Sequence, residues 1–167
     1  MRRMMVLIAL ATACTMAHAA DPVAVQSKTP YSDDALIAGK IKRECTIDTQ
    51  LPAFVAEYGK SLGEDIQLAD SVTANAKGRV LVMKIIGARS QGNAFIGHHK
   101  SITISGKLYQ DGTLVGSFDA RRNSMGGAFA GFKGSCSVLG RDAKALGKDV
   151  AEWLVHPAKG SMLGDLN

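Results

Sequence analysis

An antiparallel hairpin is predicted between Lys100 and Arg122, and it constrains the fold of this chain more than any other stretch. From Ser101 to Tyr109 apolar and polar residues alternate, which is the period-two pattern of a strand with one buried face and one solvent-exposed face. The run after Asp111-Gly112 alternates in the same way. The residues predicted to face inward are Ile102, Ile104, Gly106, Leu108, Leu114, Gly116, Phe118 and Ala120.

The turn of this hairpin has two possible forms. Asp111-Gly112 is typical of a two-residue type I′ turn, but that turn would pair Leu108 with Val115 and reverse the faces of the second strand. A three-residue loop from Gln110 to Gly112 pairs Leu108 with Leu114 and keeps the apolar faces together. We therefore predict the three-residue loop, with Gly112 in the left-handed conformation that a residue without Cβ adopts at no steric cost.

Residues 1–19 have the pattern of a secretory signal peptide. Arg2-Arg3 precedes an apolar run from Met4 to Cys14, and Ala17-His18-Ala19 is a small-x-small cleavage site. An alternative is a lipid anchor attached through Cys14. The conventional cleavage site is the better match, so we predict a periplasmic or secreted protein with no transmembrane segment in the mature chain.

The charge and the polar motifs exclude several classes of function. The formal charge of +5 falls to +3 when Arg2-Arg3 is removed, and the remaining basic residues are scattered, so no nucleic-acid partner is expected. The tandem His98-His99 would point to opposite faces of a strand and has no further ligand at a metal-binding spacing. We predict no catalytic residues, no metal site and no cofactor.

Two cysteines, Cys45 and Cys136, remain after processing. In an oxidising compartment an even pair most simply forms a disulfide. Cys45 precedes the first predicted helix and Cys136 lies in the opening turn of the last one. If both helices cover one sheet face with their starts at the same end, the two sulfur atoms can meet, and we predict this bridge. A nucleophilic cysteine is the alternative.

Apolar residues at helical spacing predict two long helices. The first follows a cap at Asp48 or Thr49 and ends at Gly63, and the last begins near Ser135 and stops before Pro157. Two glycines of the last helix are predicted to mark a close approach to the sheet or to the other helix.

A run of residues that is apolar on both faces, 79–87, predicts a central strand, and 89–99 is predicted to be a connection.

A glycine-rich stretch, 126–134, links the hairpin to the last helix. Its spacing differs from that of a phosphate-binding loop because Phe132 stands before the lysine. Bare amides at the helix start could still bind an anion, although such stretches are commonly only a permissive connection. The candidate ligand-binding residues are Phe129, Gly131, Phe132, Lys133, Gly134 and Ser135.

The hairpin ITISGKLYQDGTLVGSF, the glycine-rich link and the helix CSVLGRDAKALGKDVAEWL carry a resemblance that covers roughly Cys45 to Leu154. They are similar to uncharacterised secreted or lipid-anchored bacterial envelope families. These in turn resemble the small α+β domain of the curli-secretion channel and the TolB amino-terminal domain. The resemblance implies an accessory or assembly role in the envelope and carries no catalytic residue across. The cysteine pair is not part of the shared pattern.

The expected fold is α+β, with an antiparallel three- to four-stranded meander packed on two helices and closed by one disulfide. We expect a signal peptide at 1–19, an extended lead-in segment at 20–34, one domain at 35–157 and a flexible tail at 158–167. The predicted function is a non-catalytic periplasmic or envelope accessory or interaction domain. Its expected partner is another envelope protein or an envelope surface. The alternative is a binding module for an anionic or hydrophobic envelope ligand that uses residues 126–134.

Overall fold

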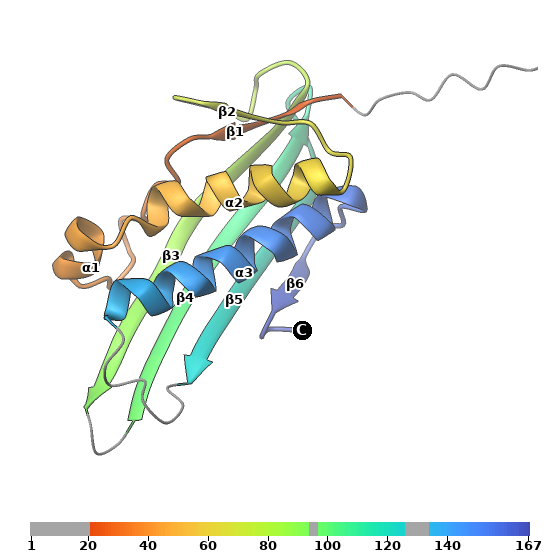
Figure 1. Cartoon of the computed structure of the whole chain (residues 1–167). Helices are drawn as coiled ribbons and strands as arrows, with labels where there is room; N and C mark the ends of the chain where they lie inside the picture. Colours follow the sequence, from red (N-terminus) through yellow and green to blue (C-terminus); the bar gives the residue numbers. More distant parts are fainter. Residues whose placement is uncertain (1–20, 94–96, 126–133) are drawn as a thin grey trace, which may run out of the picture.

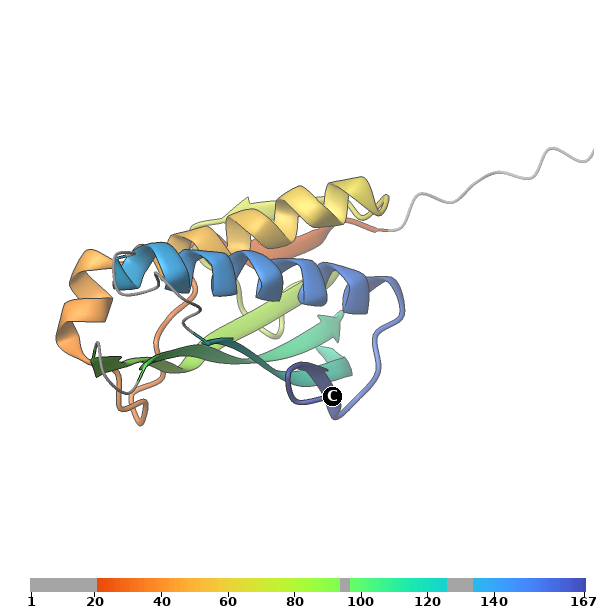
Figure 2. The ribbon, with the colours of Figure 1, turned by 60° about the horizontal axis from the view of Figure 1, so that its bottom comes forward.

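The computed structural model describes residues 21–93, 97–125 and 134–167, and within these ranges the chain forms six strands and three helices. In chain order the elements are β1 (Val23–Gln26), α1 (Gly39–Glu44), α2 (Ile47–Ser61), β2 (Ile66–Ala69), β3 (Arg79–Asn93), β4 (Gly97–Gln110), β5 (Thr113–Met125), α3 (Ser135–Val155) and β6 (Ser161–Gly164). The strands form one mixed sheet in the order β2-β1-β3-β4-β5-β6. Helices α2 and α3 lie side by side across one face of this sheet and make a two-layer domain (Figures 1 and 2).

The α+β class is confirmed, but the predicted meander is only the centre of the sheet. Strands β3, β4 and β5 are antiparallel neighbours, whereas β1 lies parallel to both β2 and β3, and β6 lies parallel to β5. The segment 20–34 and the predicted tail 158–167 therefore each contribute a strand to the sheet. Both strands have four residues and pair with partners that are distant in the chain, so no local pattern marked them.

The hairpin turn has two residues, and the predicted three-residue loop is wrong. Asp111 and Gly112 both have positive φ, 49° and 80°, and Gln110 pairs directly with Thr113, as in a type I′ turn. The carboxylate of Asp111 accepts a hydrogen bond of 2.8 Å from the backbone N–H of Gly78, and this bond lowers the pKa of Asp111. The turn is thereby tied to the segment that enters β3.

A β-bulge at Val115 explains why simple alternation argued against the two-residue turn. Tyr109 pairs with Leu114, but Leu108 pairs with Gly116, so Val115 is an extra residue on β5. The extra residue shifts the register by one and restores the apolar face. Beyond the bulge the predicted inward residues of β5 are buried as expected.

Strands β3 and β4 are longer than the sequence pattern indicated. Residues 89–93 and 97–99, which belong to the predicted connection 89–99, continue the antiparallel ladder, and Ser90 pairs with Lys100. A second register shift between Ile85 and Gly87 interrupts the alternation just before this stretch. Because of this irregularity and the polar residues after it, the sequence pattern did not indicate that the strands continue.

The core lies between the helix layer and the inner face of the sheet. Side chains of both long helices, such as Leu51, Val55 and Leu146, are buried against inward residues of the strands, such as Ile104. Helix α2 starts after Thr46, so the predicted caps lie inside the helix, while its predicted left-handed end at Gly63 is confirmed by a φ of 84°. Residues 41–47, where the sequence is compatible with a short strand, are not a strand, because Gly39–Glu44 form the short helix α1 and α2 begins at Ile47.

No helix within the described ranges is long and apolar enough to cross a membrane.

Candidate functional site

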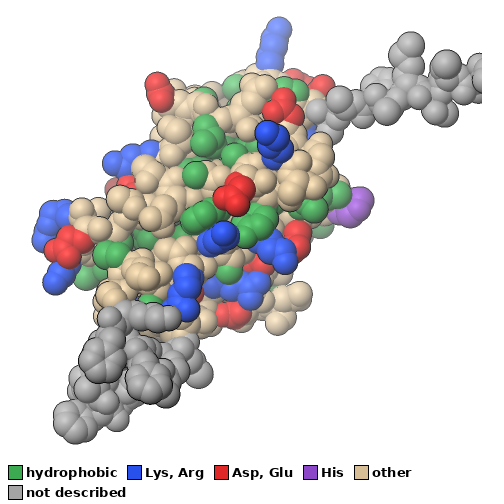
Figure 3. Space-filling view, in the orientation of Figure 1, with side chains coloured by type: hydrophobic (Ala, Val, Ile, Leu, Met, Phe, Trp, Pro, Cys, Tyr) green, Lys and Arg blue, Asp and Glu red, His purple; other side chains and the backbone are tan. Residues whose placement is uncertain are grey.

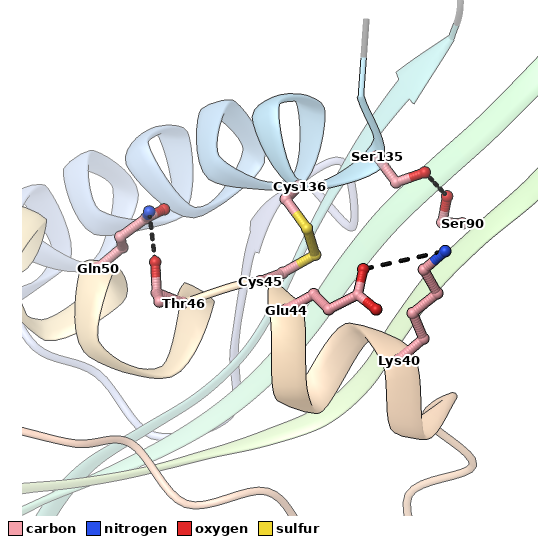
Figure 4. Close-up of a disulfide and its surroundings, with 8 residues drawn as sticks. All are labelled: Lys40, Glu44, Cys45, Thr46, Gln50, Ser90, Ser135 and Cys136. Carbon is pink, nitrogen blue, oxygen red and sulfur yellow. Dashed lines mark hydrogen bonds and ion pairs between the residues drawn. A yellow bond between two sulfur atoms is a disulfide. The ribbon is translucent and has the colours of Figure 1, made fainter.

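The predicted disulfide between Cys45 and Cys136 is present, with the two Cα atoms 4.9 Å apart (Figure 4). Cys45 directly follows α1, and Cys136 lies in the first turn of α3. Helices α2 and α3 run in the same direction and begin at the same end of the sheet (Figure 1). This is the arrangement that the bridge requires.

The predicted anion-binding stretch is described only at its end. Phe129, Gly131, Phe132 and Lys133 lie outside the described residues. Gly134, the N-cap residue of α3, has no side chain that could form a capping hydrogen bond, and Ser135 is the first residue of the helix. The Ser135 hydroxyl accepts a hydrogen bond of 2.9 Å from the Ser90 hydroxyl on β3 (Figure 4). The predicted anion site therefore stays a prediction.

The tandem histidines lie near the start of β4, where His98 pairs with Gly92 and His99 with Gln91. The side chain of His99 is exposed. In the described part of the chain, no group of three or more histidine, cysteine or acidic side chains lies close enough together to hold a metal ion.

A buried polar cluster lies between β4, β5 and the middle of α3, where sequence reasoning placed no functional residue. Asp142 is 4% exposed, and its Oδ1 accepts a hydrogen bond from the Ser124 hydroxyl. Lys100, also 4% exposed, is the cross-strand partner of Ser124 on the same inner face. The second carboxylate oxygen of Asp142 is buried and has no hydrogen-bond partner among the described residues.

Burial is the main cause that raises the pKa of Asp142 above its ordinary value of 3.8, and nearby Asp165 adds to it. The hydrogen bond from Ser124 and the positive charges of Arg141 and Lys100 act in the opposite direction but do not cancel the effect of burial. A carboxyl group whose pKa is raised on folding binds more protons in the folded state than in the unfolded state. Its ionisation therefore destabilises the fold as the pH rises above about 3.8.

Replacing Asp142 with asparagine is expected to increase the stability of the domain at neutral pH. The amide keeps an oxygen that accepts the Ser124 hydrogen bond, and it carries no charge to bury. Denaturant unfolding measured from pH 3 to pH 8 should show an advantage over the wild type that shrinks as the pH falls toward 3.8. An advantage that does not change with pH would show that ionisation of Asp142 does not cause the difference.

A second set of charges connects β5 to α3 and to the end of the chain. Arg122 donates two hydrogen bonds, of 2.8 and 2.5 Å, to the carboxylate of Asp149 on α3, and it lies 3.3 Å from Asp165. Asp165 also accepts a bond of 2.6 Å from the backbone N–H of Asn123. These charges are satisfied by one another, so they hold elements together. The alternation of inward and outward residues, continued to the ends of the hairpin, places Lys100, Arg122 and Ser124 on the inward face. This signal in the sequence could have indicated both the Asp142 cluster and the Arg122 cluster.

The face of the sheet opposite α2 and α3 is not covered by a helix in the described ranges, although Val80 on it, the cross-strand partner of Tyr109, is fully buried. Figure 2 shows both long helices on one side of the sheet, and within the described ranges no helix lies on the other side. We call this side of β3, β4 and β5 the outer sheet face. Ile86 and Val115 on it are each 38% exposed. The outward side chains are those of Val82, Lys84, Ile86, Thr103, Ser105, Lys107, Tyr109, Val115, Ser117, Asp119 and Arg121.

A hollow of about 310 Å³ lies on the outer sheet face, and two lysines, Lys84 and Lys107, belong to its lining. The rest of its lining is Val82, Ser105, Gly106 and Tyr109. Two larger hollows, of about 630 and 390 Å³, are lined by residues of both charge signs. In contrast to these two, the charged residues of the outer-face hollow are all cations.

The helix side of the molecule mixes charges of both signs. In Figure 3 lysine and arginine side chains alternate with acidic ones over α2 and α3, with apolar atoms between them. The ammonium of Lys144 lies over the rings of Phe54 and Tyr58, 5.6 and 5.9 Å from their centroids. The helix side therefore carries charges of both signs, whereas the only charged residues in the outer-face hollow are lysines.

The fold and the disulfide define a two-layer α+β domain, and comparison with known proteins gives its relatives in structure. No family model matches the chain, and no curated protein matches it in sequence. Protein XCC0632 from Xanthomonas campestris, of family DUF330, matches with a TM-score of 0.57 and 10% identity over 81% of this chain and 83% of that one. This likeness shows a shared fold.

Two further solved structures match less closely. Lipoprotein GNA1162 from Neisseria meningitidis gives a TM-score of 0.48 and 9% identity over 80% of this chain and 98% of that chain. The PelC dodecamer from Paraburkholderia phytofirmans gives a TM-score of 0.47 and 17% identity over 77% of this chain and 86% of that chain. The predicted resemblance to the curli-secretion channel and TolB domains is not confirmed by these structures.

Proposed function

We propose that this chain is a non-catalytic accessory or interaction domain of the bacterial envelope. The signal-peptide pattern of residues 1–19 and the Cys45–Cys136 bridge support an oxidising compartment outside the cytoplasm. The fold shared with XCC0632 is compatible with this role, although a fold alone does not define a function. The minor alternative, attachment to a membrane through a lipid on Cys14, leaves the proposed role unchanged.

The outer sheet face carries the proposal. A sheet that is covered on one side only has a second side available for contact, and here that side holds the exposed apolar side chains of Ile86 and Val115 beside several cations. Two of the less exposed arginines, Arg79 and Arg122, support the same interpretation, because each is paired with a carboxylate. Arg79, for example, lies 2.7 Å from Glu64 and also donates to the carbonyl of Leu154.

Site-specific photo-crosslinking in intact cells tests this proposal. A photoreactive phenylalanine analogue at Ile86, on the outer sheet face, is expected to give a discrete adduct with another envelope component. The same analogue at Glu57, an exposed position on α2, is the control and is expected to give none. The same adduct pattern from both positions, or no adduct from Ile86, would contradict an interaction through this face. Fractionation of the same cells checks that the chain is exported.

The alternative function, a ligand-binding module that uses residues 126–134, stays a prediction because most of this stretch lies outside the described residues.

A further inference from the structure

The two lysines of the outer-face hollow have no acidic partner in the part of the chain that the structure describes. Lys84 and Lys107 are both exposed, and neither takes part in any ion pair there. The outward acid Asp119 on β5 is the cross-strand partner of Ser105 and a diagonal neighbour of Lys107, but it forms no ion pair among the described residues and does not line the hollow. Two positive charges therefore share one concave site without a compensating carboxylate in its lining.

Strand register brings the two lysines together. Lys84 pairs with Ser105 and Val82 pairs with Lys107, so the lysines are diagonal neighbours on one face of β3 and β4. Diagonal neighbours in an antiparallel pair have Cα atoms about 7–8 Å apart, a separation that two long side chains can close around one group. Like charges at this separation repel each other, and an anion between them would remove the repulsion.

The remaining lining of the hollow also suits an anion. The hydroxyls of Ser105 and Tyr109 can donate hydrogen bonds, and the lining contains no carboxylate. The volume of about 310 Å³ exceeds that of a single inorganic anion and reaches the lower end of small-ligand pockets, about 300–1,000 Å³. There is thus room for an attached organic group against Val82 and the ring of Tyr109.

We propose that this hollow binds a phosphate group, carried either by a membrane lipid headgroup or by a free phosphorylated molecule. Two ammonium groups match the charge of a phosphate better than that of a single carboxylate, and the two hydroxyls supply further donors to its oxygens. The inference deepens the proposed envelope role, because it assigns a ligand chemistry to the same outer sheet face.

Binding assays on the exported, mature chain test the proposal in two arms. One arm measures binding to vesicles of phosphatidylcholine with and without phosphatidylglycerol, and the other measures binding of glycerol phosphate by calorimetry. The test variant is Lys84→Ala with Lys107→Ala. The matched control is Lys60→Ala with Lys148→Ala, which removes the same charge from exposed positions on the helix side. A third variant, Lys84→Arg with Lys107→Arg, keeps the charge of the hollow.

We expect the double alanine variant of the hollow to bind at least about tenfold more weakly, while the helix-side control and the arginine variant keep most of the affinity. Binding to phosphatidylglycerol vesicles alone would identify a lipid headgroup, and binding of glycerol phosphate would identify a free ligand. Binding in neither arm, or an equal loss in both alanine variants, would overturn the proposal. Crosslinking from Ile86 is measured separately, so failure of the interaction role and failure of this site can be distinguished.

Discussion

Replacing Cys45 or Cys136 with serine is expected to lower the free energy of unfolding of the mature chain by about 4–5 kcal/mol. The bridge joins residues 91 positions apart, and closing so long a loop removes a large part of the conformational entropy of the unfolded chain. A typical domain has a net stability of about 5–15 kcal/mol, so the loss would leave this one marginal. No other single change considered for this chain is expected to cost as much.

Denaturant unfolding of both single variants and of the double variant measures this effect. Because each replacement removes the same bridge, the three variants should have nearly equal stabilities, close to that of the reduced wild type. Thiol counting on the unfolded, non-reduced wild type provides an independent check. Two free thiols, or a midpoint that does not change on reduction, would refute the contribution of the bridge.

Gly147→Ala is expected to destabilise the domain by about 1–3 kcal/mol, although alanine is the better helix former. A Cβ atom at position 147 would lie 3.0 Å from the backbone carbonyl carbon of Phe54, and it would also overlap the Cβ of that residue. The backbone of α2 cannot move away without disturbing the packing of Val55 and Leu51, which are buried in the core. The glycine is therefore required where α2 and α3 cross closely.

Gly140→Ala, one position of the same helix two turns earlier, is the matched control. Its Cβ would meet only the side-chain oxygen of Gln50, at 3.0 Å, and that side chain can move. The helix propensity of alanine should then dominate and stabilise the domain by about 1 kcal/mol. Unfolding midpoints of the two variants should shift in opposite directions. Shifts of equal sign and size would show that the contact at Gly147 is not tight.

Several features of the fold could be predicted because they depend on local chemistry. The alternation from Ser101 to Tyr109 predicted which side of β4 is buried, and the structure confirms Ile102 and Ile104 in the core. The helical spacing predicted both long helices. The prediction that glycines of the last helix mark a close approach is confirmed at Gly147. The bridge between Cys45 and Cys136 was predicted from the expected oxidising compartment and from the position of each cysteine at a helix start, and the structure confirms it.

Other features could not be predicted from a local pattern. The bulge at Val115 adds one residue to β5, and a strict count of alternation therefore favoured a longer turn than the one present. The polar cluster around Asp142 forms because Lys100 and Ser124 continue the inward face where the core becomes polar. Polar residues at inward positions look like the end of a strand when only the sequence is considered.

The candidate binding sites also differ in whether a local sequence pattern indicates them. The sequence directed attention to the glycine-rich stretch, because an unusual composition is visible in one window of the chain. The hollow on the outer sheet face escaped notice because Lys84 and Lys107 belong to different strands and have ordinary neighbours in sequence. Only the register of β3 against β4 brings them into one concave surface.

By itself the sequence determined the α+β class, the inward residues of the hairpin and the pairing of Cys45 with Cys136. The first two of these properties depend on neighbours within a few residues, where backbone geometry and side-chain polarity leave little choice. The tertiary structure alone decided that β1 and β6 join the sheet as parallel strands, and that both long helices lie on the same sheet face. Such pairings depend on contacts between residues that are far apart in the chain, and the free energy of those contacts has no signature in any short stretch of sequence.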